Sequence, residues 1–505
     1  MTNGFITYSH ENRGKVLLLF LLFLLAIYQF ITAGFESFTI VCLLPFVVLF
    51  IYFAFKWKMF TFWTLFIVNY FLQMHDITIP IPLSLPNEML QITLLAIAIV
   101  DARETPNFDR TINIMLLALI IWCGFCTLQL MNNTCDLGID IGGWYGGARM
   151  MAFQLLYIFL VFSLYISSPS ILIKYLKLWA ILTVFSAFWT WKQQYIGFTE
   201  AENIFLQGRG RTTHLLNAGT LIRYFSTFSD AANYGCNAAA AATAFIIISI
   251  TSKIKKDRIF FIIVASAVIW GMFASGTRTG IFCMAAGFIL YIFLSKSFKI
   301  AVPFTIAFAI FGFLLIFTTI GQGNQQIRRM RSAFDKKDAS ANVRDINKAA
   351  IKKYLTDAPW GLGLSANYDN VPANNKYKKV STIPPDSEYV FIWVHTGRIG
   401  ITVFVIITAL MLIGACSVVF FRLRSPSLIG VGASLCCAFL AIQLGGYANQ
   451  VLMQYPNCLI FYGGLSIVYI LPYIESDWIE LENQRIIKQK EQSRLKLEKK
   501  LAKRV

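Results

Sequence analysis

Three arginines, Arg223, Arg278 and Arg344, lie in polar segments from widely separated parts of the chain. A guanidinium group is always charged, and its planar fork of donors matches the oxygens of a phosphate or a carboxylate. If the three segments meet at one face of a membrane, these side chains can close around a diphosphate. The alternative is that each arginine pairs with a lipid headgroup or a nearby carboxylate, which is common at membrane interfaces.

Candidate acid–base residues lie in the same polar segments. Asp386 and Glu388 directly precede an apolar helix, where the helix dipole favours a carboxylate. Asp386 is a candidate general base toward a hydroxyl group, and its alternative role is to cap the helix. His214 in another polar segment is a second candidate base, whereas His395 is expected to lie deeper, about two and a half helical turns on. No Asp-x-Asp pair occurs in the polar segments, so we expect a site without a metal ion or other cofactor.

The composition places these residues in a membrane protein. Hydrophobic residues make up 57% of the 505 residues and charged residues 14%, with a mean hydropathy of +0.62. These values exclude an ordinary soluble enzyme and a disordered chain, and they are typical of an all-α, polytopic membrane protein. Because a spanning helix needs roughly 20 apolar residues, we predict about 12–14 transmembrane helices. No basic helix with interleaved aromatic residues indicates nucleic acid.

Four regions follow along the chain. Residues 1–320 are predicted to hold about eleven transmembrane helices, and residues 399–474 about three more. Between them, residues 321–398 form the longest polar interval, which is a large loop domain. Residues 475–505 are predicted to form a basic amphipathic helix, which either lies on the anionic membrane lipids or binds a partner.

The distribution of lysine and arginine predicts the orientation. Nearly every short basic connection falls on one side if both termini are cytoplasmic, as the positive-inside rule requires. The segments that carry Arg223, Arg278, Arg344 and Asp386 then face outward, against the charge bias. The apolar segments contain almost no ionisable residues, which argues against an ion-coupled transporter.

The residues around the three arginines form an ordered series of motifs. They are Arg-x-x-x-Thr-Phe-x-Asp-x-x-Asn from Arg223, Ser-Gly-Thr-Arg-Thr-Gly around Arg278, Arg344 with a later Pro-x-Gly-x-Gly, and a polar residue before Glu-Tyr with Gly397-x-x-Gly400. This order, over residues 222–411, resembles the bacterial O-antigen ligase and O-antigen polymerase superfamily.

The resemblance implies a metal-independent glycosyltransferase of the bacterial inner membrane with its active site facing the periplasm. The donor would be an oligosaccharide linked to undecaprenyl diphosphate, and an acceptor hydroxyl would attack its anomeric carbon. In that family outer arginines bind the departing diphosphate, and Arg223, Arg278 and Arg344 stand at the matching positions. Ligases of the family have a histidine where this chain has Asp386.

The replacement of that histidine favours a polymerase of O-antigen or capsular repeat units. The alternatives are a ligase that transfers the glycan to lipid A-core or another final acceptor, and a transporter or flippase for the lipid-linked glycan. A polymerase predicts two glycan-binding grooves beside the arginines, because its donor and its acceptor are both lipid-linked repeat units. A ligase predicts one groove and a lateral opening for its acceptor.

Overall fold

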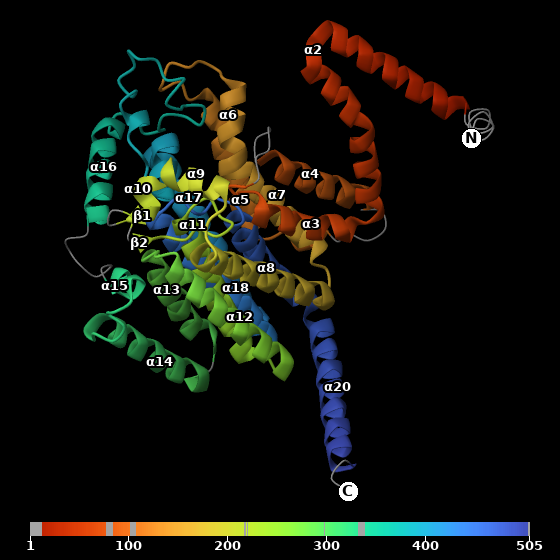
Figure 1. The fold of residues 1–505 in the computed structure, drawn as a ribbon, viewed down its shortest axis with the longest axis vertical. Coiled ribbons are helices and arrows are strands. Elements are labelled where there is room, and N and C mark those ends of the chain that lie inside the picture. The colour runs from red at the N-terminus through yellow and green to blue at the C-terminus, as the bar shows by residue number, and fades with distance from the viewer. Residues whose placement is uncertain are drawn as a thin grey trace. The chain divides into compact units, whose positions relative to one another are not determined.

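The computed structural model describes residues 13–76, 84–101, 108–216, 219, 221–296, 298–331 and 339–502 (Figure 1). The chain divides into two compact units, residues 1–62 and 63–505. The first unit contains α2 (Arg13–Lys56), and α3 (Lys58–Phe71) starts in the first unit and ends in the second. The described residues are predominantly helical, which confirms the predicted all-α membrane fold.

The second unit holds the remaining helices. Up to the large polar interval they are α4 (Ser84–Val100), α5 (Ile114–Leu128), α6 (Ile141–Ala148), α7 (Gln154–Tyr165), α8 (Pro169–Tyr195), α9 (Glu200–Gln207), α10 (Arg211–His214), α11 (Ala231–Thr251), α12 (Lys255–Ala274), α13 (Thr279–Leu294) and α14 (Phe298–Phe317). After it come α15 (Gln325–Arg331), α16 (Ala339–Leu355), α17 (Glu388–Ser417), α18 (Pro426–Ala448), α19 (Gly463–Ile470) and α20 (Glu475–Ala502). One short antiparallel hairpin pairs β1 (Leu215–Leu216) with β2 (Leu221–Ile222).

Nine helical runs within the described parts of the chain are long and apolar enough to cross a membrane, or up to ten if one bent pair counts as a span. The helices α4 and α13 are apolar but shorter. Helix α2 is continuous over 44 residues, with Pro45 inside it.

Helix α11 forms the centre of the second unit. It packs against α12, α13 and α18, and 83% of its apolar window is buried. Its run of alanines, residues 238–242, is fully buried, because side chains this small let neighbouring helices approach closely. A Cβ atom at Gly287 of α13 would lie 2.7 Å from Cγ2 of Thr243, so this packing also needs the glycine.

Helix α17 is broken at Gly397, which has a φ of +68°. The Pro-x-Gly-x-Gly turn inserts there, since the N–H groups of Leu362 and Gly363 donate to the carbonyl oxygens of Val394 (2.9 Å) and His395 (3.0 Å). A Cβ atom at Gly397 would lie 2.1 Å from the carbonyl oxygen of Pro359. The glycines of these two motifs thus allow two backbones to meet.

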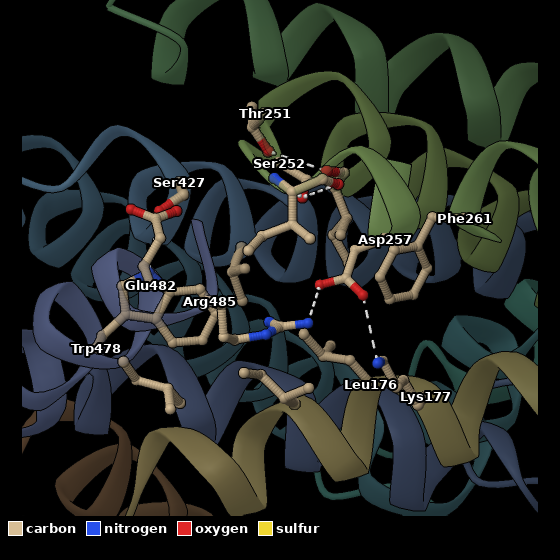
Figure 2. A pocket seen from close by; sticks show the side chains of 15 residues that line it. Leu176, Lys177, Thr251, Ser252, Asp257, Phe261, Ser427, Trp478, Glu482 and Arg485 are labelled. Atoms are coloured by element: carbon tan, nitrogen blue, oxygen red, sulfur yellow. Dashed lines mark hydrogen bonds and ion pairs between the residues drawn. The ribbon is translucent and has the colours of Figure 1, made fainter. Parts of the chain in front are cut away.

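Helix α20 is held by ion pairs at its first half (Figure 2). Asp257 of α12 accepts from Arg485 of α20 at 2.6 Å and from Lys177 of α8 at 3.3 Å. Lys253 contacts Glu482 at 2.8 Å. The sequence predicted that this helix lies on the membrane lipids or binds a partner. In the structure, its first half contacts α12, the residues just before it and, through Asp257, α8.

Candidate active site

Arg223 follows strand β2 and reaches the turn that carries Arg278. Its guanidinium group donates to the carbonyl oxygen of Ser275 (3.3 Å), to Oγ1 of Thr277 (3.2 Å) and to the carbonyl oxygen of Thr213 (3.0 Å). The Ser-Gly-Thr-Arg motif therefore binds one candidate arginine, Arg223, while it carries another, Arg278.

Arg278 and Arg344 both lie within electrostatic range of Arg223. Burial lowers the pKa of Arg223, and the Asp230 carboxylate opposes this effect. The positive charges of Arg278 and Arg344 lower the pKa of Arg223 further. Asp230 itself caps α11 by accepting from the N–H groups of residues 232 (2.8 Å) and 233 (2.9 Å). An anion bound here would relieve the repulsion among the guanidinium groups.

A further arginine joins this group. Nε of Arg329, in α15, donates to the carbonyl oxygen of Gly276 at 2.7 Å. Gly276 has a φ of +60° and lies between two arginines, since a Cβ atom there would be 3.2 Å from Arg329 and 3.4 Å from Arg223. The sequence showed Arg329 in a basic cluster, but nothing in that cluster distinguished it from its neighbours.

Asn449, just after α18, connects Arg344 to the start of α13. Its Oδ1 atom accepts from Nη2 of Arg344 at 3.2 Å. Its Nδ2 atom donates to Oγ1 of Thr279, the residue after Arg278, at 3.3 Å. This asparagine orients one arginine relative to the next, and the sequence motifs did not include it.

Asp386 lies in a cavity of about 540 Å³ that Arg344 also lines. One carboxylate oxygen accepts from Nδ2 of Asn347 at 2.8 Å. The cap of α17 is instead Ser387, whose hydroxyl accepts from the N–H of Val390 at 3.1 Å. Asp386 therefore does not serve as the helix cap. The cavity, which we call the charged cavity, is also lined by Asp345, Lys348, Lys352, Tyr389, Trp393 and Tyr447.

Glu388 is occupied elsewhere. It is 3% exposed, and its Oε2 atom accepts from the N–H of Leu452 at 2.9 Å. The backbone of Val451 and Met453 also donates to this carboxylate. Glu388 therefore holds the backbone of residues 451–453, which follow Asn449 in the chain.

His214 is also fully engaged. The N–H of Ala231 donates to its Nε2 atom at 3.0 Å, so the ring proton resides on Nδ1, which donates to the carbonyl oxygen of Gly210 at 3.1 Å. Burial and the neighbouring charge of Arg223 lower the pKa of His214 to about 4. The ring is thus neutral at pH 7, and its contacts join the loop that carries Arg223 to the start of α11.

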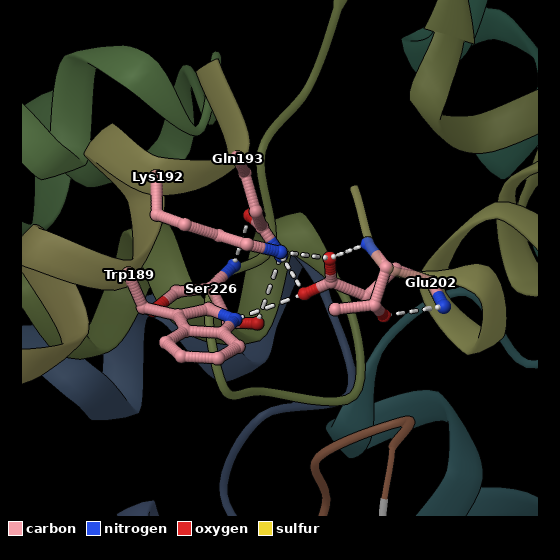
Figure 3. Close-up of polar contacts among 6 residues, drawn as sticks. Trp189, Lys192, Gln193, Glu202 and Ser226 are labelled. Carbon is pink, nitrogen blue, oxygen red and sulfur yellow. Dashed lines mark hydrogen bonds and ion pairs between the residues drawn. The ribbon is translucent and has the colours of Figure 1, made fainter. Parts of the chain in front are cut away.

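Glu202 anchors that loop to α8 (Figure 3). Its buried carboxylate accepts from Nε1 of Trp189 (2.9 Å), Nε2 of Gln193 (2.7 Å), Nζ of Lys192 (3.2 Å) and the N–H of Thr199 (2.8 Å). Burial alone would raise the pKa of Glu202, but these hydrogen bonds outweigh burial and hold the pKa below its usual range. Gln193 in turn accepts from the N–H of Ser226 at 2.9 Å, three residues after Arg223.

One ionisable pair departs from the expectation that the apolar segments contain almost none. Glu88 of α4 is 4% exposed and accepts from Nη1 of Arg149 at 3.2 Å. Burial of a carboxylate costs free energy unless it is paired, which explains why the arginine lies within reach. Arg209 and Arg211, by contrast, are exposed.

Within the described parts of the chain, no group of three or more His, Cys, Asp or Glu side chains is arranged to hold a metal ion. Fold and site together define a polytopic helical membrane protein in which Arg223, Arg278 and Arg344 come from separate segments and Arg223 lies within electrostatic range of the other two.

Residues 261–405 match the family model described as O-antigen ligase. This match over residues 261–405 supports the resemblance to the O-antigen ligase and polymerase superfamily that the motifs predicted. The match includes Arg278, Arg344 and Asp386, whereas Arg223 and His214 precede it. No curated protein matches the chain.

Proposed function

We propose that the chain is a glycosyltransferase that polymerises O-antigen or capsular repeat units on the periplasmic face of the inner membrane. Its donor is a glycan on undecaprenyl diphosphate, and its acceptor is a hydroxyl of another repeat unit. The observation that carries the proposal is that Arg344, which lies within electrostatic range of Arg223, lines the same cavity as Asp386.

The chemistry is a displacement at the anomeric carbon. The acceptor oxygen forms the new bond to that carbon, and the bond from the carbon to the diphosphate oxygen breaks. Asp386 receives the proton of the acceptor hydroxyl as general base. The guanidinium groups stabilise the negative charge that develops on the leaving diphosphate, because fixed charges at that position need no reorganisation. His214 and Asn449 position the arginines in this proposal, and Glu388 holds the neighbouring backbone.

A polymerase is favoured over a ligase by the carboxylate at Asp386, which stands where ligases of the family have histidine. A ligase that uses lipid A-core as its acceptor would bind the same donor at the same arginines. The acceptor therefore separates the two enzymes. Cells that carry the chain as their one polymerase would lose long glycans without it and keep single repeat units, whereas loss of a ligase leaves lipid-linked polymer.

Transport of the lipid-linked glycan is a second candidate, and the buried pair of Glu88 and Arg149 is the observation that favours it. A buried ionisable pair is typical of ion-coupled carriers. In a transporter, replacement of Glu88 by glutamine would block movement across the membrane while joining of repeat units continued. In a transferase, Glu88→Gln would leave the rate of the joining reaction unchanged, whereas Arg278→Gln would lower it.

The test is transfer of lipid-linked oligosaccharide, extracted from the cells that produce the chain, by the purified protein in proteoliposomes. We expect Arg278→Gln to reduce the rate by roughly 100-fold or more, as removal of one charge-stabilising donor does elsewhere. Arg209→Gln is the control, because Arg209 is exposed. Equal activity of the two variants would refute the transferase site.

A further inference from the structure

A second cavity lies against another face of the first turns of α17. It encloses about 530 Å³ and includes Phe391, Val394 and His395 in its wall. The charged cavity uses Tyr389, Val390 and Trp393 instead. Since helical residues three or four positions apart share a face, these two sets lie on different faces of the same two turns. One helix therefore separates the two cavities.

The second cavity differs from the first in charge. None of the residues that line it is an aspartate, glutamate, lysine or arginine. Its polar and aromatic members are Ser365, Asn367, Tyr368, Ser381, Phe391 and His395. We call it the uncharged cavity.

The hydrogen-bonding groups of the uncharged cavity suit hydroxyl groups. Nδ1 of His395 donates to the carbonyl oxygen of Gly363 at 3.1 Å, so in the neutral ring Nε2 remains as an acceptor. Oδ1 of Asn367 accepts two backbone N–H groups at 2.9 Å, which leaves its NH₂ group as the donor. Amide, hydroxyl and imidazole groups beside aromatic rings fit an uncharged, polyhydroxylated molecule and give no counter-charge to an anion.

We propose that the uncharged cavity binds uncharged sugar residues of the glycan substrate. The proposal rests on the proposed transferase function and assigns a place to the sugar chain. Pro384 and Asp386 line the charged cavity, and Pro385 between them lines the uncharged one. The two cavities therefore lie next to each other at this three-residue segment. A glycan whose reacting end lies at Asp386 can continue around the start of α17 into the uncharged cavity.

Helix α6 forms one wall of the uncharged cavity and provides the site for a test. Gly147 packs closely, since a Cβ atom there would lie 2.4 Å from the carbonyl oxygen of Leu364. Gly146 also lines the cavity, but a Cβ atom there meets no atom within 4 Å. The Cβ atom of a large side chain at position 146 would therefore meet no clash, and the rest of the side chain would fill the cavity.

The experiment compares Gly146→Trp with Gly124→Trp in proteoliposomes. Gly124 of α5 is a helical glycine that also has no atom within 4 Å of its added Cβ, and it does not line the cavity. The donor is lipid-linked oligosaccharide extracted from the producing cells. The acceptor probe is the same oligosaccharide, released by mild acid and fluorescently labelled. KM is measured for each substrate in turn.

We expect Gly146→Trp to raise one KM about tenfold, which corresponds to the loss of one or two hydrogen bonds. A rise for the labelled oligosaccharide assigns the cavity to the acceptor, and a rise for the lipid-linked substrate assigns it to the donor glycan. Both KM values equal to those of Gly124→Trp would overturn the proposal.

Two controls separate failure of this proposal from failure of the transferase function. If Arg278→Gln retains full activity, the transferase site is wrong whatever Gly146→Trp does. If Arg278→Gln is inactive and Gly146→Trp is unchanged, the uncharged cavity alone is excluded as a sugar site. Ser381→Trp fills the same cavity from its other wall and replaces Gly146→Trp if that variant does not accumulate in the membrane.

Discussion

The charged and uncharged cavities are similar in volume, about 540 and 530 Å³, yet their walls have different chemistry. Lysines, an arginine and two aspartates line the first, whereas glycines, serines and aromatic residues line the second. The same two turns of α17 contribute residues to both cavities. In the proposed mechanism, one helix separates the place for leaving-group charge and proton transfer from the place for uncharged sugar residues.

The sharpest test of this division is Asp386→Asn. An amide cannot accept the proton of an acceptor hydroxyl, so we expect the rate of transfer to fall by about 10²- to 10⁴-fold while the KM of the labelled oligosaccharide stays the same. Asp345→Asn is the matched control, because Asp345 lines the same cavity and is exposed. Equal rates in the two variants would remove the general-base assignment.

Gly397→Ala is expected to damage both cavities together. The added Cβ would lie 2.1 Å from the carbonyl oxygen of Pro359, and alanine would also be strained at a positive φ. We expect a loss of about 3 kcal/mol in stability, measured by thermal unfolding in detergent. Gly124→Ala, at an open helical position, should instead be neutral or slightly stabilising. A stable Gly397→Ala protein in which the KM of only one of the two substrates changes would show that the two cavities are independent.

Asn449→Ala addresses the charged cavity alone. The substitution removes the hydrogen bonds to Arg344 and Thr279, so we expect the KM of the lipid-linked donor to rise about tenfold. The acceptor KM should not change. Asn375→Ala is the control, since Asn375 donates to Asp136 at 2.8 Å in the polar segment outside both cavities. An equal effect on both substrates would contradict a specific role in positioning Arg344.

His214 should affect stability more than activity. Its folded-state pKa of about 4 lies below the unfolded value of roughly 6.5, so the unfolded chain binds more protons between these values. Stability should therefore fall by about 2 kcal/mol as the pH drops from 7 to 5. Thermal unfolding of wild-type protein and His214→Gln at both pH values checks this, and the variant should show the smaller change. The same pH dependence in both proteins would exclude His214 as its source.

Spacing and charge bias predicted three arginines, and the structure brings Arg278 and Arg344 within electrostatic range of Arg223. The same patterns did not reveal Asn449, which lies just after α18 and 105 residues from its partner Arg344. The ion pair of Glu88 and Arg149 was not predicted for the same reason, since 61 residues separate the two. A charged residue at the edge of an apolar run can face lipid, water or a partner, and only the folded chain distinguishes these environments.

The acid–base residues show the same limit. The sequence placed Asp386, Glu388 and His214 near one end of the membrane helices but gave no means of ranking them. Their hydrogen bonds separate them: Glu388 and His214 are occupied by backbone groups, whereas Asp386 lines a cavity. The catalytic assignment of Asp386 stays a prediction that the Asp386→Asn rate will decide.

Helix α11 has a consequence for membrane insertion. It is 83% buried within the protein, yet its mean hydropathy of 1.5 is the lowest among the nine candidate spans in the described parts of the chain. Asn233, Asn237 and Thr243, which are buried in the fold, would each face hydrocarbon if the helix entered lipid alone, and polar groups there are costly. During synthesis α11 should therefore leave the insertion machinery together with α12, so that the helix at the centre of the fold depends on its neighbours to enter the bilayer.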